Sequence, residues 1–489
     1  MNYLSLVFSF TIVMAVEAKL PNIVFILADD LGYGELGCYG QEKINTPVID
    51  QLAAEGMKFT QHYTGAPVCA PARCVLMTGK HLAHAEIRGN RDSGNGKIFP
   101  GQWPITADAL TIAEVLKKAG YTTGAFGKWG LGPSDSSGDP NKQGFDNYYG
   151  FNCQRNAHSF YPPFLDCDGK ELSVNKNPVL GHIKKPKGEV NADDYRDENY
   201  APDLILAECL KFIDSNKDNP FFLYLPFVEP HVSMHPPQVW VDKYPKEWDK
   251  EPYRGNRGYI PHPRPRAGYA AMISDFDEHI GKVLDRLKKH GIADNTLVIF
   301  TSDNGPTHDV GGVDTQFFNS TGGLRGRKGS CYEGGIRVPT IVRWHGMIKP
   351  GSSTNAASYF PDWFPTLAAV GRAALDDAPN GNLDGVSLLP VLMGGKIPKR
   401  HEPMIWEFSG YGGIVAIRDG KWKALRRGLK REKGPSPWEL YDLDTDRNEQ
   451  NDLAKKNPKI VKQLEKRWLQ TRVDEPHFPL PLIENHRGK

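Results

Sequence analysis

The 489-residue chain has no large excess of charge of either sign. Its 60 Lys and Arg side chains stand against 58 Asp and Glu, which gives a formal net charge of +2 at pH 7. A near-neutral chain lacks the broad positive field that attracts nucleic acids or acidic membrane surfaces. We therefore expect no nucleic-acid partner, and any recognition of an anion must come from a local group of side chains.

Long apolar runs are also missing. The run Leu4–Val16 is too short to span a bilayer, which takes about 18 unbroken apolar residues, and no later segment reaches that length. Small residues at Val16 and Ala18 close this run, so we predict a secretory signal over residues 1–18, although it carries no Lys or Arg. No cysteine follows the predicted cleavage site to carry a lipid. The sequence thus predicts a secreted or periplasmic protein without membrane insertion.

Cysteine is scarce, and its number is odd. Seven cysteines are too few for a disulfide framework in a chain of this length. Cys153 and Cys167 are close enough in sequence to pair, and two free thiols are an equally good interpretation. No Cys-x-x-Cys or Cys/His spacing indicates a structural zinc site. At least one thiol is left over, and its role must be sought in its surroundings.

The apolar segments alternate between strand and helix patterns. Asn22–Asp30 and Thr296–Gly305 contain short β-branched and aromatic runs, typical of strands buried on both faces. Between them, a capping box of Thr111 and Glu114 opens one helix, and Ala270–Gly291 has the spacing of a second, amphipathic helix. This alternation predicts an α/β fold with a large, mostly parallel central sheet and helices on both faces.

The pattern changes towards the C-terminus. Short strand candidates at Gly413–Arg427 and Trp438–Asp446 precede one long charged helix, Asn457–Arg472. We predict a smaller C-terminal α+β domain with a short antiparallel sheet and a long helix. The α/β domain would then span residues 19–395 and the smaller domain residues 396–489.

Two polar pairs directly follow the buried strands. Asp29 and Asp30 end the first segment, and Asp303 and Asn304 end the second. Ligands of open α/β sheets bind beyond the carboxyl ends of the strands, so the two pairs should converge. Their oxygens suit a hard cation, and we predict a Ca²⁺ site, with Mg²⁺ as the alternative. Either pair alone would be explained more simply as loop-capping side chains.

Four further segments make the pattern specific. Cys69-Ala-Pro-Ala-Arg precedes Met-Thr-Gly, GKWGLG starts at Gly127, SDNGP at Ser302 and GRKGSCYEGGIRVP at Gly326. In order and spacing, these segments and residues 21–40 resemble the type I sulfatases, relatives of arylsulfatase A in the alkaline phosphatase superfamily. The resemblance extends over nearly the whole chain after the predicted signal. It implies an enzyme that hydrolyses sulfate monoesters.

The resemblance also implies a role for each motif residue. Cys69 corresponds to the cysteine that a maturation enzyme converts to formylglycine, whose hydrated aldehyde is the nucleophile and can release sulfate by re-forming the aldehyde. Arg73 would hold this side chain, while Lys128 and Lys328 would bind sulfate oxygens. Pro71 suits the first turn of a helix whose N–H groups favour an anion there. The implied cation ligands are Asp29, Asp30, Cys69 in its modified form, Asp303 and Asn304.

Histidines raise two questions. A leaving alkoxide needs a proton, and the family has an acid histidine where this chain has His231, with His235 as the local competitor. The family commonly reads Gly-Lys-Trp-His-Leu-Gly, with a histidine that touches the diol, but this chain has Gly130 at that position. His84 and His308 are the candidates to fill the role, unless the site works without it.

Two polar loops, residues 81–96 and 307–320, adjoin the motifs in sequence. Polar loops occur on protein surfaces both as binding segments and as ordinary solvated connections. For these two loops, contact with substrate and simple solvation are equally good interpretations. The side chains that we predict to contact substrate are His84, Arg88, Asn90, His308 and Asp309.

The sequence therefore predicts a sulfatase that acts on a sulfated small molecule or glycan, with a formylglycine-generating enzyme as protein partner. A phosphomonoester or phosphonate monoester hydrolase of the same superfamily is one alternative, because such enzymes share the metal scaffold. A non-catalytic glycan-binding protein is the other. The motifs are intact except at Gly130, which argues against a protein that has lost catalysis.

Overall fold

The computed structural model describes residues 19–94, 96–181, 188–308, 310–375 and 383–484. The predicted signal and Asp309 lie outside these ranges. Among the residues described, no helix combines the length and apolar character needed to cross a bilayer. All seven cysteines are described and carry free thiols, Cys153 and Cys167 included.

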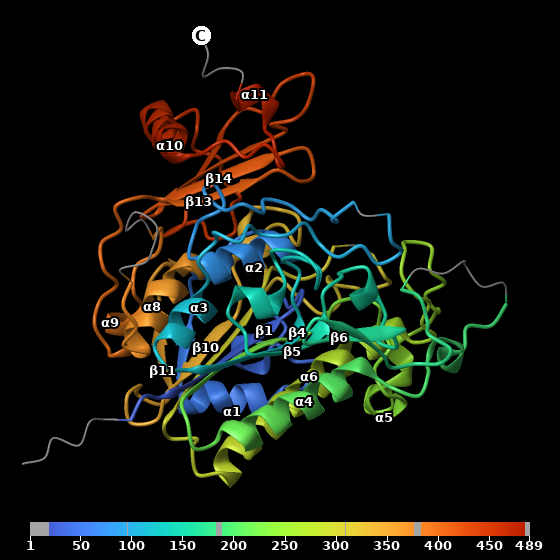
Figure 1. Cartoon of the computed structure of the whole chain (residues 1–489). Helices are drawn as coiled ribbons and strands as arrows, with labels where there is room; N and C mark the ends of the chain where they lie inside the picture. The colour runs from blue at the N-terminus through green and yellow to red at the C-terminus, as the bar shows by residue number, and fades with distance from the viewer. Residues whose placement is uncertain (1–18, 95, 182–187, 309, 376–382, 485–489) are drawn as a thin grey trace, which may run out of the picture.

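A ten-stranded sheet forms the centre of the molecule (Figure 1). Its five central strands, in the order β9-β1-β8-β4-β5, all run parallel, and antiparallel pairs occur towards both edges. The predicted large, mostly parallel sheet is confirmed. In chain order the strands are β1 (Asn22–Ala28), β2 (Met57–Phe59), β4 (Thr122–Lys128), β5 (Asn147–Phe151), β6 (Phe164–Cys167), β7 (Lys170–Ser173), β8 (Phe221–Pro226), β9 (Thr296–Ser302), β10 (Thr340–Arg343) and β11 (Ser352–Thr354).

Helices cover both faces of this sheet (Figure 1). Successive side chains of β1 point to opposite faces, and every residue of that strand is buried, which explains its unbroken apolar run. One face is covered by α1 (Pro47–Glu55), α4 (Ala201–Asn216) and α6 (Pro265–Lys289), and the other by α2 (Cys69–Thr78), α3 (Ile112–Lys118) and α8 (Trp363–Val370). The three-layer arrangement agrees with the prediction.

Local signals in the sequence account for several element ends. The capping box of Thr111 and Glu114 is present at the start of α3. Helix α6 begins at Pro265, five residues before the predicted Ala270, because a proline in the first turn needs no N–H partner. Besides several 3-10 helices, the short strands and α-helices are β3 (His62–Tyr63), β12 (Ser358–Tyr359), α5 (Gln238–Val241), α7 (Glu333–Ile336), α9 (Leu389–Leu392) and α11 (Pro481–Glu484).

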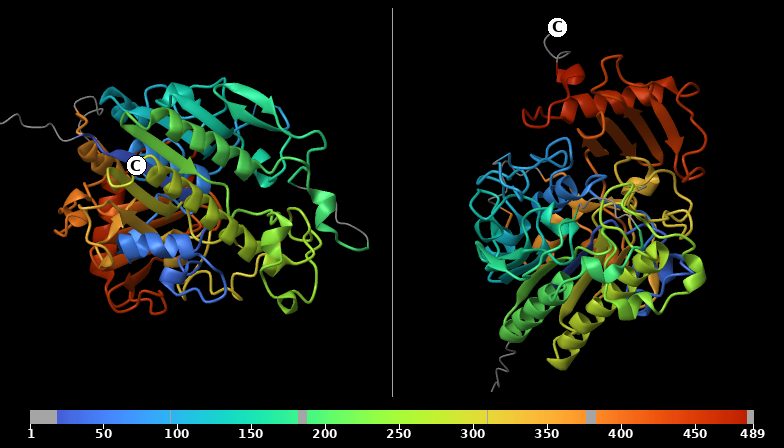
Figure 2. Two further views of the ribbon diagram at one scale, coloured as in Figure 1. Left: turned by 90° about the horizontal axis from the view of Figure 1, so that it is seen from below. Right: turned by 90° about the vertical axis from the view of Figure 1, so that its right-hand side faces the viewer.

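A separate four-stranded antiparallel sheet lies at the C-terminal end of the chain (Figure 2). Helix α10 (Pro458–Thr471) covers it, with Leu464 and Trp468 buried against the sheet. The predicted antiparallel sheet and long helix are confirmed. The strands are β13 (Met404–Phe408), β14 (Ile414–Asp419), β15 (Trp422–Arg427) and β16 (Glu439–Asp442).

Buried ion pairs connect this small sheet to the rest of the molecule. Glu407 of β13 accepts hydrogen bonds from Arg88, which follows α2, at 2.8 Å and from Arg472, which follows α10, also at 2.8 Å. Lys423 of β15 donates to Glu333 of α7 at 2.8 Å. Buried charges of this kind are strongly destabilising when one partner is removed, so the pairs fix how the two sheets meet.

Candidate active site

The two polar pairs meet at the carboxyl ends of β1 and β9. Because these strands are parallel neighbours, Asp29 and Asp30 emerge beside Asp303 and Asn304. The amide of Asn304 donates to Asp30 Oδ1 at 2.7 Å, and the backbone N–H of Asp30 donates to Asp303 Oδ1 at 3.2 Å. All four side chains are fully buried. The predicted convergence is therefore present.

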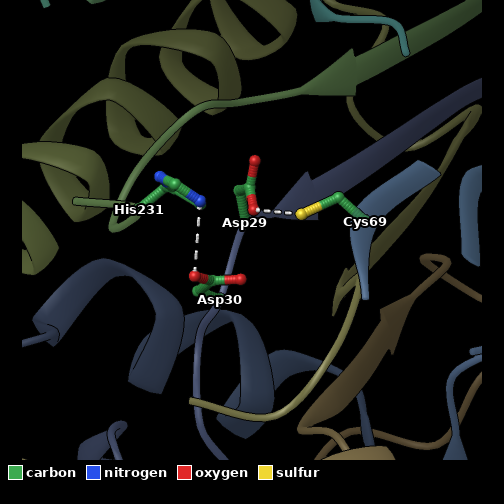
Figure 3. Close-up of side chains that lie close together, drawn as sticks. All are labelled: Asp29, Asp30, Cys69 and His231. Atoms are coloured by element: carbon green, nitrogen blue, oxygen red, sulfur yellow. Dashed lines mark hydrogen bonds and ion pairs between the residues drawn. The ribbon is translucent and has the colours of Figure 1, made fainter. Parts of the chain in front are cut away.

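Helix α2 points its first residue, Cys69, into this cluster. Figure 3 shows the Cys69 thiol directed at Asp29, with 3.3 Å between Sγ and Asp29 Oδ1. The ammonium group of Lys328 lies 3.4 Å from the same sulfur. Burial, and then the charge of Asp29, raise the pKa of the Cys69 thiol above its ordinary value. Reactive cysteines have a lowered pKa instead, so the unmodified thiol is a poor nucleophile here.

Three cations balance the buried carboxylates. Lys128 Nζ lies 2.5 Å from Asp29 Oδ2, Arg73 Nη2 lies 2.7 Å from Asp303 Oδ2, and Lys328 Nζ lies 2.7 Å from Asp30 Oδ1. Arg73 also donates to Asp29 Oδ2 at 3.3 Å and to the carbonyl of Lys128. The sequence motifs far apart in the chain thus form one charged cluster, in which each cation has an acidic partner.

The same cations set the ionisation of the carboxyl groups. Burial opposes the charge on Asp29, but Lys128, His231 and Arg73 hold the pKa of that carboxyl well below its usual range. Burial, and then the charge on Asp29, raise the pKa of Asp303 to about 6. Burial also raises the pKa of Asp30. A further positive charge among these carboxyls would keep all of them ionised.

The donor set fits a divalent cation. One ligand atom from each of Asp29, Asp30, Cys69 and His231 lies within 4.8 Å of the others. Asn304 Oδ1 is buried beside them and accepts no hydrogen bond from the part of the chain that the structure describes. An orphaned buried carbonyl oxygen next to three carboxylates is the arrangement that a hard, oxygen-preferring cation would complete.

His231 lies in the segment that follows β8, and its ring is directed at Asp30 (Figure 3). Its Nε2 is 3.6 Å from Asp30 Oδ2, and its Nδ1 is 2.5 Å from the carbonyl oxygen of Val232. Burial, followed by the charges of Lys328 and Lys128, lowers the pKa of His231 well below its ordinary value. An anion bound between His231 and the two lysines would raise that pKa again, which suits a proton donor that acts on a bound anion.

His235, the competitor of His231, is directed elsewhere. Its Nε2 lies 3.0 Å from the carbonyl oxygen of Pro261, and its ring contacts His262 and Tyr195. Of the two histidines, only His231 is within ion-pair distance of an acidic residue of the cluster.

The predicted substrate-contacting side chains are mostly bound to protein partners. His84 lies between Asp384, at 2.9 Å, and the carbonyl oxygen of Thr471, at 2.6 Å. Arg88 is 2% exposed and donates to Ala85, Glu407 and Val473. These contacts join the loop after α2 to the C-terminal segment, so the geometry lends no support to substrate binding by either residue, or to His84 as the replacement at Gly130.

The other predicted loop residues differ. Asn90 accepts a hydrogen bond from the backbone N–H of Ala70 at 3.2 Å and so completes the first turn of α2. His308 is half-buried, with its ring 6.4 Å from that of Tyr411. Asp309 lies outside the described residues. The roles predicted for His308, contact with substrate and replacement of the histidine missing at Gly130, therefore stay hypotheses.

Three residues next to the cluster were not found from the sequence. The ring of His158 stacks on that of His231 at 5.3 Å, and Tyr259 contacts both rings edge-on. Gln154 lies beside Gly130. Gln154 follows β5, and His158 ends a short 3-10 helix (Asn156–His158), so neither residue lies in a segment with a periodic pattern that the sequence could reveal.

Comparisons with known proteins identify the family. Residues 21–371 match the model of the sulfatase family, and residues 327–474 match that of the N-sulphoglucosamine sulphohydrolase C-terminal region. An N-acetylgalactosamine-6-O-sulfatase of Bacteroides thetaiotaomicron is 33% identical over 92% of both chains, and human arylsulfatase A is 33% identical over 83% of this chain and 75% of its own. The crystal structure of Ps i-CgsB with k-i-k-neocarrahexaose superposes with a TM-score of 0.74, at 28% identity over 92% of both chains. The chain belongs to the sulfatase family and is an enzyme that hydrolyses sulfate esters.

Proposed function

We propose that this sulfatase removes sulfate from a sulfated carbohydrate, with formylglycine at residue 69 as nucleophile and Ca²⁺ as the cation. The observation that carries this proposal is the position of Cys69. It occupies the first turn of a buried helix, within 3.4 Å of both Asp29 and Lys328, and its raised pKa disfavours the thiolate, the reactive form of a cysteine. A side chain that needs modification to react is what the family resemblance implies.

Each neighbour then has a role that its contacts support. The cation, when bound, supplies Lewis-acid stabilisation of a sulfate oxygen. Lys128 is bound to Asp29, and Lys328 is bound to Asp30 and lies 3.4 Å from the Cys69 sulfur; both would donate to sulfate oxygens once these carboxylates bind the cation. Arg73 would hold residue 69 and the carboxylates in position. The proposed cation ligands are Asp29, Asp30, residue 69, Asp303 and Asn304.

His231 is proposed as the acid that protonates the leaving oxygen. Its Nε2 faces the cluster, whereas the Nε2 of His235 faces Pro261. The position of a sulfate between His231 and the lysines would place the departing oxygen near this nitrogen. A general acid must first lie within hydrogen-bond reach of the leaving oxygen, and its pKa is considered only after that.

The names of the relatives support a sugar substrate. One relative with 92% mutual coverage is an N-acetylgalactosamine-6-O-sulfatase, and a structural neighbour was solved with a neocarrahexaose. We further propose export to the periplasm or medium after removal of residues 1–18, and a domain boundary near residue 395. A phosphomonoester or phosphonate monoester hydrolase remains the alternative, because the cation and lysines would also bind a phosphoryl group.

A direct assay tests the proposed function. Purified mature protein, supplied with Ca²⁺, is offered defined sulfated saccharides, and released sulfate is measured with the products identified by mass spectrometry. We expect sulfate release that exceeds phosphate release from the matched phosphate ester. Cys69→Ala is the control for contaminating activity. Faster cleavage of the phosphate ester would favour the alternative, and binding without turnover would favour a non-catalytic glycan-binding protein.

A further inference from the structure

Gly130 leaves a space beside the nucleophile helix. This residue has φ +83°, in the left-handed region, and a Cβ built on it would lie 3.8 Å from Arg73 Cδ. A side chain at this position would therefore extend along Arg73, which contacts Asp29 and Asp303. The same Cβ would lie 3.3 Å from Gln154 Nε2. The Nε2 group of Gln154 thus lies against the position that a side chain at residue 130 would occupy.

The Nε2 group of Gln154 finds no hydrogen-bond acceptor among the described residues. The residue is 7% exposed, and its Nε2 atom is buried without an acceptor. A buried N–H group that is left unpaired costs free energy comparable to a lost hydrogen bond, so such groups are rare and require a reason. An acceptor that is present only when substrate or product is bound would provide that reason.

The backbone around Gln154 is held in place. Its own N–H donates to Gln102 Oε1 at 2.7 Å, and the N–H of Ala157 donates to the carbonyl of Cys153 at 3.1 Å. Four residues on, His158 stacks on His231. The loop after β5 therefore borders the site both at Arg73 and at the proposed acid, and Gln154 is fixed where it can meet a ligand.

We propose that Gln154 contacts the substrate, and that its amide N–H donates a hydrogen bond to a sulfate oxygen held at residue 69, in place of the side chain that Gly130 lacks. The inference rests on the proposed function for the identity of that oxygen. An amide is neutral at all accessible pH values, so Gln154 binds and orients the sulfate group but takes no proton.

The experiment compares Gln154→Leu with wild type in two measurements. Leu has a similar volume but no donor, so we expect kcat/KM on a sulfate ester to fall about 10²-fold, as when one donor to a developing oxyanion is lost. We expect the Kd of inorganic sulfate, measured by calorimetry, to rise about tenfold because a hydrogen bond to an anion is lost. Gln154→Glu, which is isosteric but negative, should be weaker still in both and serves if Gln154→Leu does not fold.

Gln143→Leu is the matched control. Gln143 is also buried, but its amide donates to the carbonyls of Thr106 and Ser137. This variant should lose thermal stability while kcat/KM and the sulfate Kd of the folded protein stay near wild type. If neither value changes in Gln154→Leu, the inference is wrong. If wild type cleaves no sulfate ester, the proposed function fails, and the sulfate Kd alone then decides the role of Gln154.

Discussion

Individual residues at this site are defined by burial as much as by chemical type. Cys69, Asp30 and Asp303 are all buried, and in each case burial is the largest cause of a raised pKa. Asp29 is the exception, because three cations and His231 outweigh its burial. The neighbouring cations therefore favour the charged form of Asp29, whereas burial disfavours the charged forms of Asp30 and Asp303.

The first prediction concerns Cys69. In an active preparation, the tryptic peptide that contains residue 69 should carry an aldehyde in place of the thiol, because the buried thiol is too weakly acidic to act itself. Mass spectrometry of that peptide makes the measurement. Cys69→Ser should have little or no turnover, and Cys74→Ser, five residues further along α2, should keep it. A fully active sample with an unmodified thiol would contradict the mechanism.

The second prediction concerns His231. Replacement by Ala should slow cleavage of a sugar sulfate about 10²- to 10⁴-fold, the usual contribution of a general acid, and should affect an activated aryl sulfate much less. The reason is that a phenolate leaves with little help from a proton. Measuring kcat/KM on both substrates makes the comparison, with His235→Ala as control because its Nε2 faces Pro261. Equal losses on both substrates would instead point to sulfate binding by His231.

Among the secondary-structure elements, the positions of site residues at the ends of parallel strands could be predicted from the sequence. The contacts made by residues in loops could not. Asp29 and Asp303 follow buried strands, and neighbouring parallel strands end at one edge, so their meeting could be predicted. His84 and Arg88 lie in a polar loop, which we interpreted as a substrate-binding loop. Their actual partners, Asp384 and Glu407, are about 300 residues away in sequence, so no local pattern could indicate these contacts. Gln154 and His158 were missed for the same reason: no local pattern reports a contact between two loops.

The loop after α2 gives a prediction of stability. Burial opposes the charge on His84, but its hydrogen bond to Asp384 raises the pKa of the imidazole above 6.5, and the pKa of Asp384 is lowered from 3.8. A raised pKa of a histidine stabilises the fold below the unfolded value of 6.5, and this contribution disappears as pH rises through the folded value. The lowered pKa of Asp384 contributes above 3.8. The pair is therefore most stabilising between these values.

Accordingly, His84→Ala should lose about 1–3 kcal/mol near pH 5.5, the range for a charge-assisted hydrogen bond, and the difference from wild type should shrink by about pH 8.5. Denaturant melts at the two pH values measure it. His345→Ala is the control, since His345 is exposed and its Nδ1 lies 3.8 Å from Asp294 Oδ1, which is too far for a hydrogen bond. If the difference in free energy of unfolding between wild type and His84→Ala grew with pH, protonated His84 would not be the stabilising form.

At the scale of the whole molecule, the cation and the fold should depend on each other. Three buried carboxyl groups from two strands lie together, and a ligand that binds only the folded chain stabilises it by about 2.7 kcal/mol at 100 times its Kd. Chelation should therefore remove turnover and also lower the melting temperature, and Ca²⁺ should restore both. Asp303→Ala should abolish the thermal effect of Ca²⁺. Demonstrably metal-free protein with full activity and an unchanged melting temperature would exclude the proposed site.

The bond network of Arg88 has a consequence for the order of events during synthesis. The loop that follows the nucleophile helix is held by Glu407 and by the segment near Arg472, so it is fixed only after almost the entire chain exists. At about 5–20 residues per second, the ribosome needs tens of seconds to travel from codon 69 to codon 472. In the finished molecule Cys69 is 1% exposed, out of reach of any modifying enzyme. The proposed conversion of Cys69 would therefore have to take place before the segments around Glu407 and Arg472 fold onto this loop, while the chain is still being made.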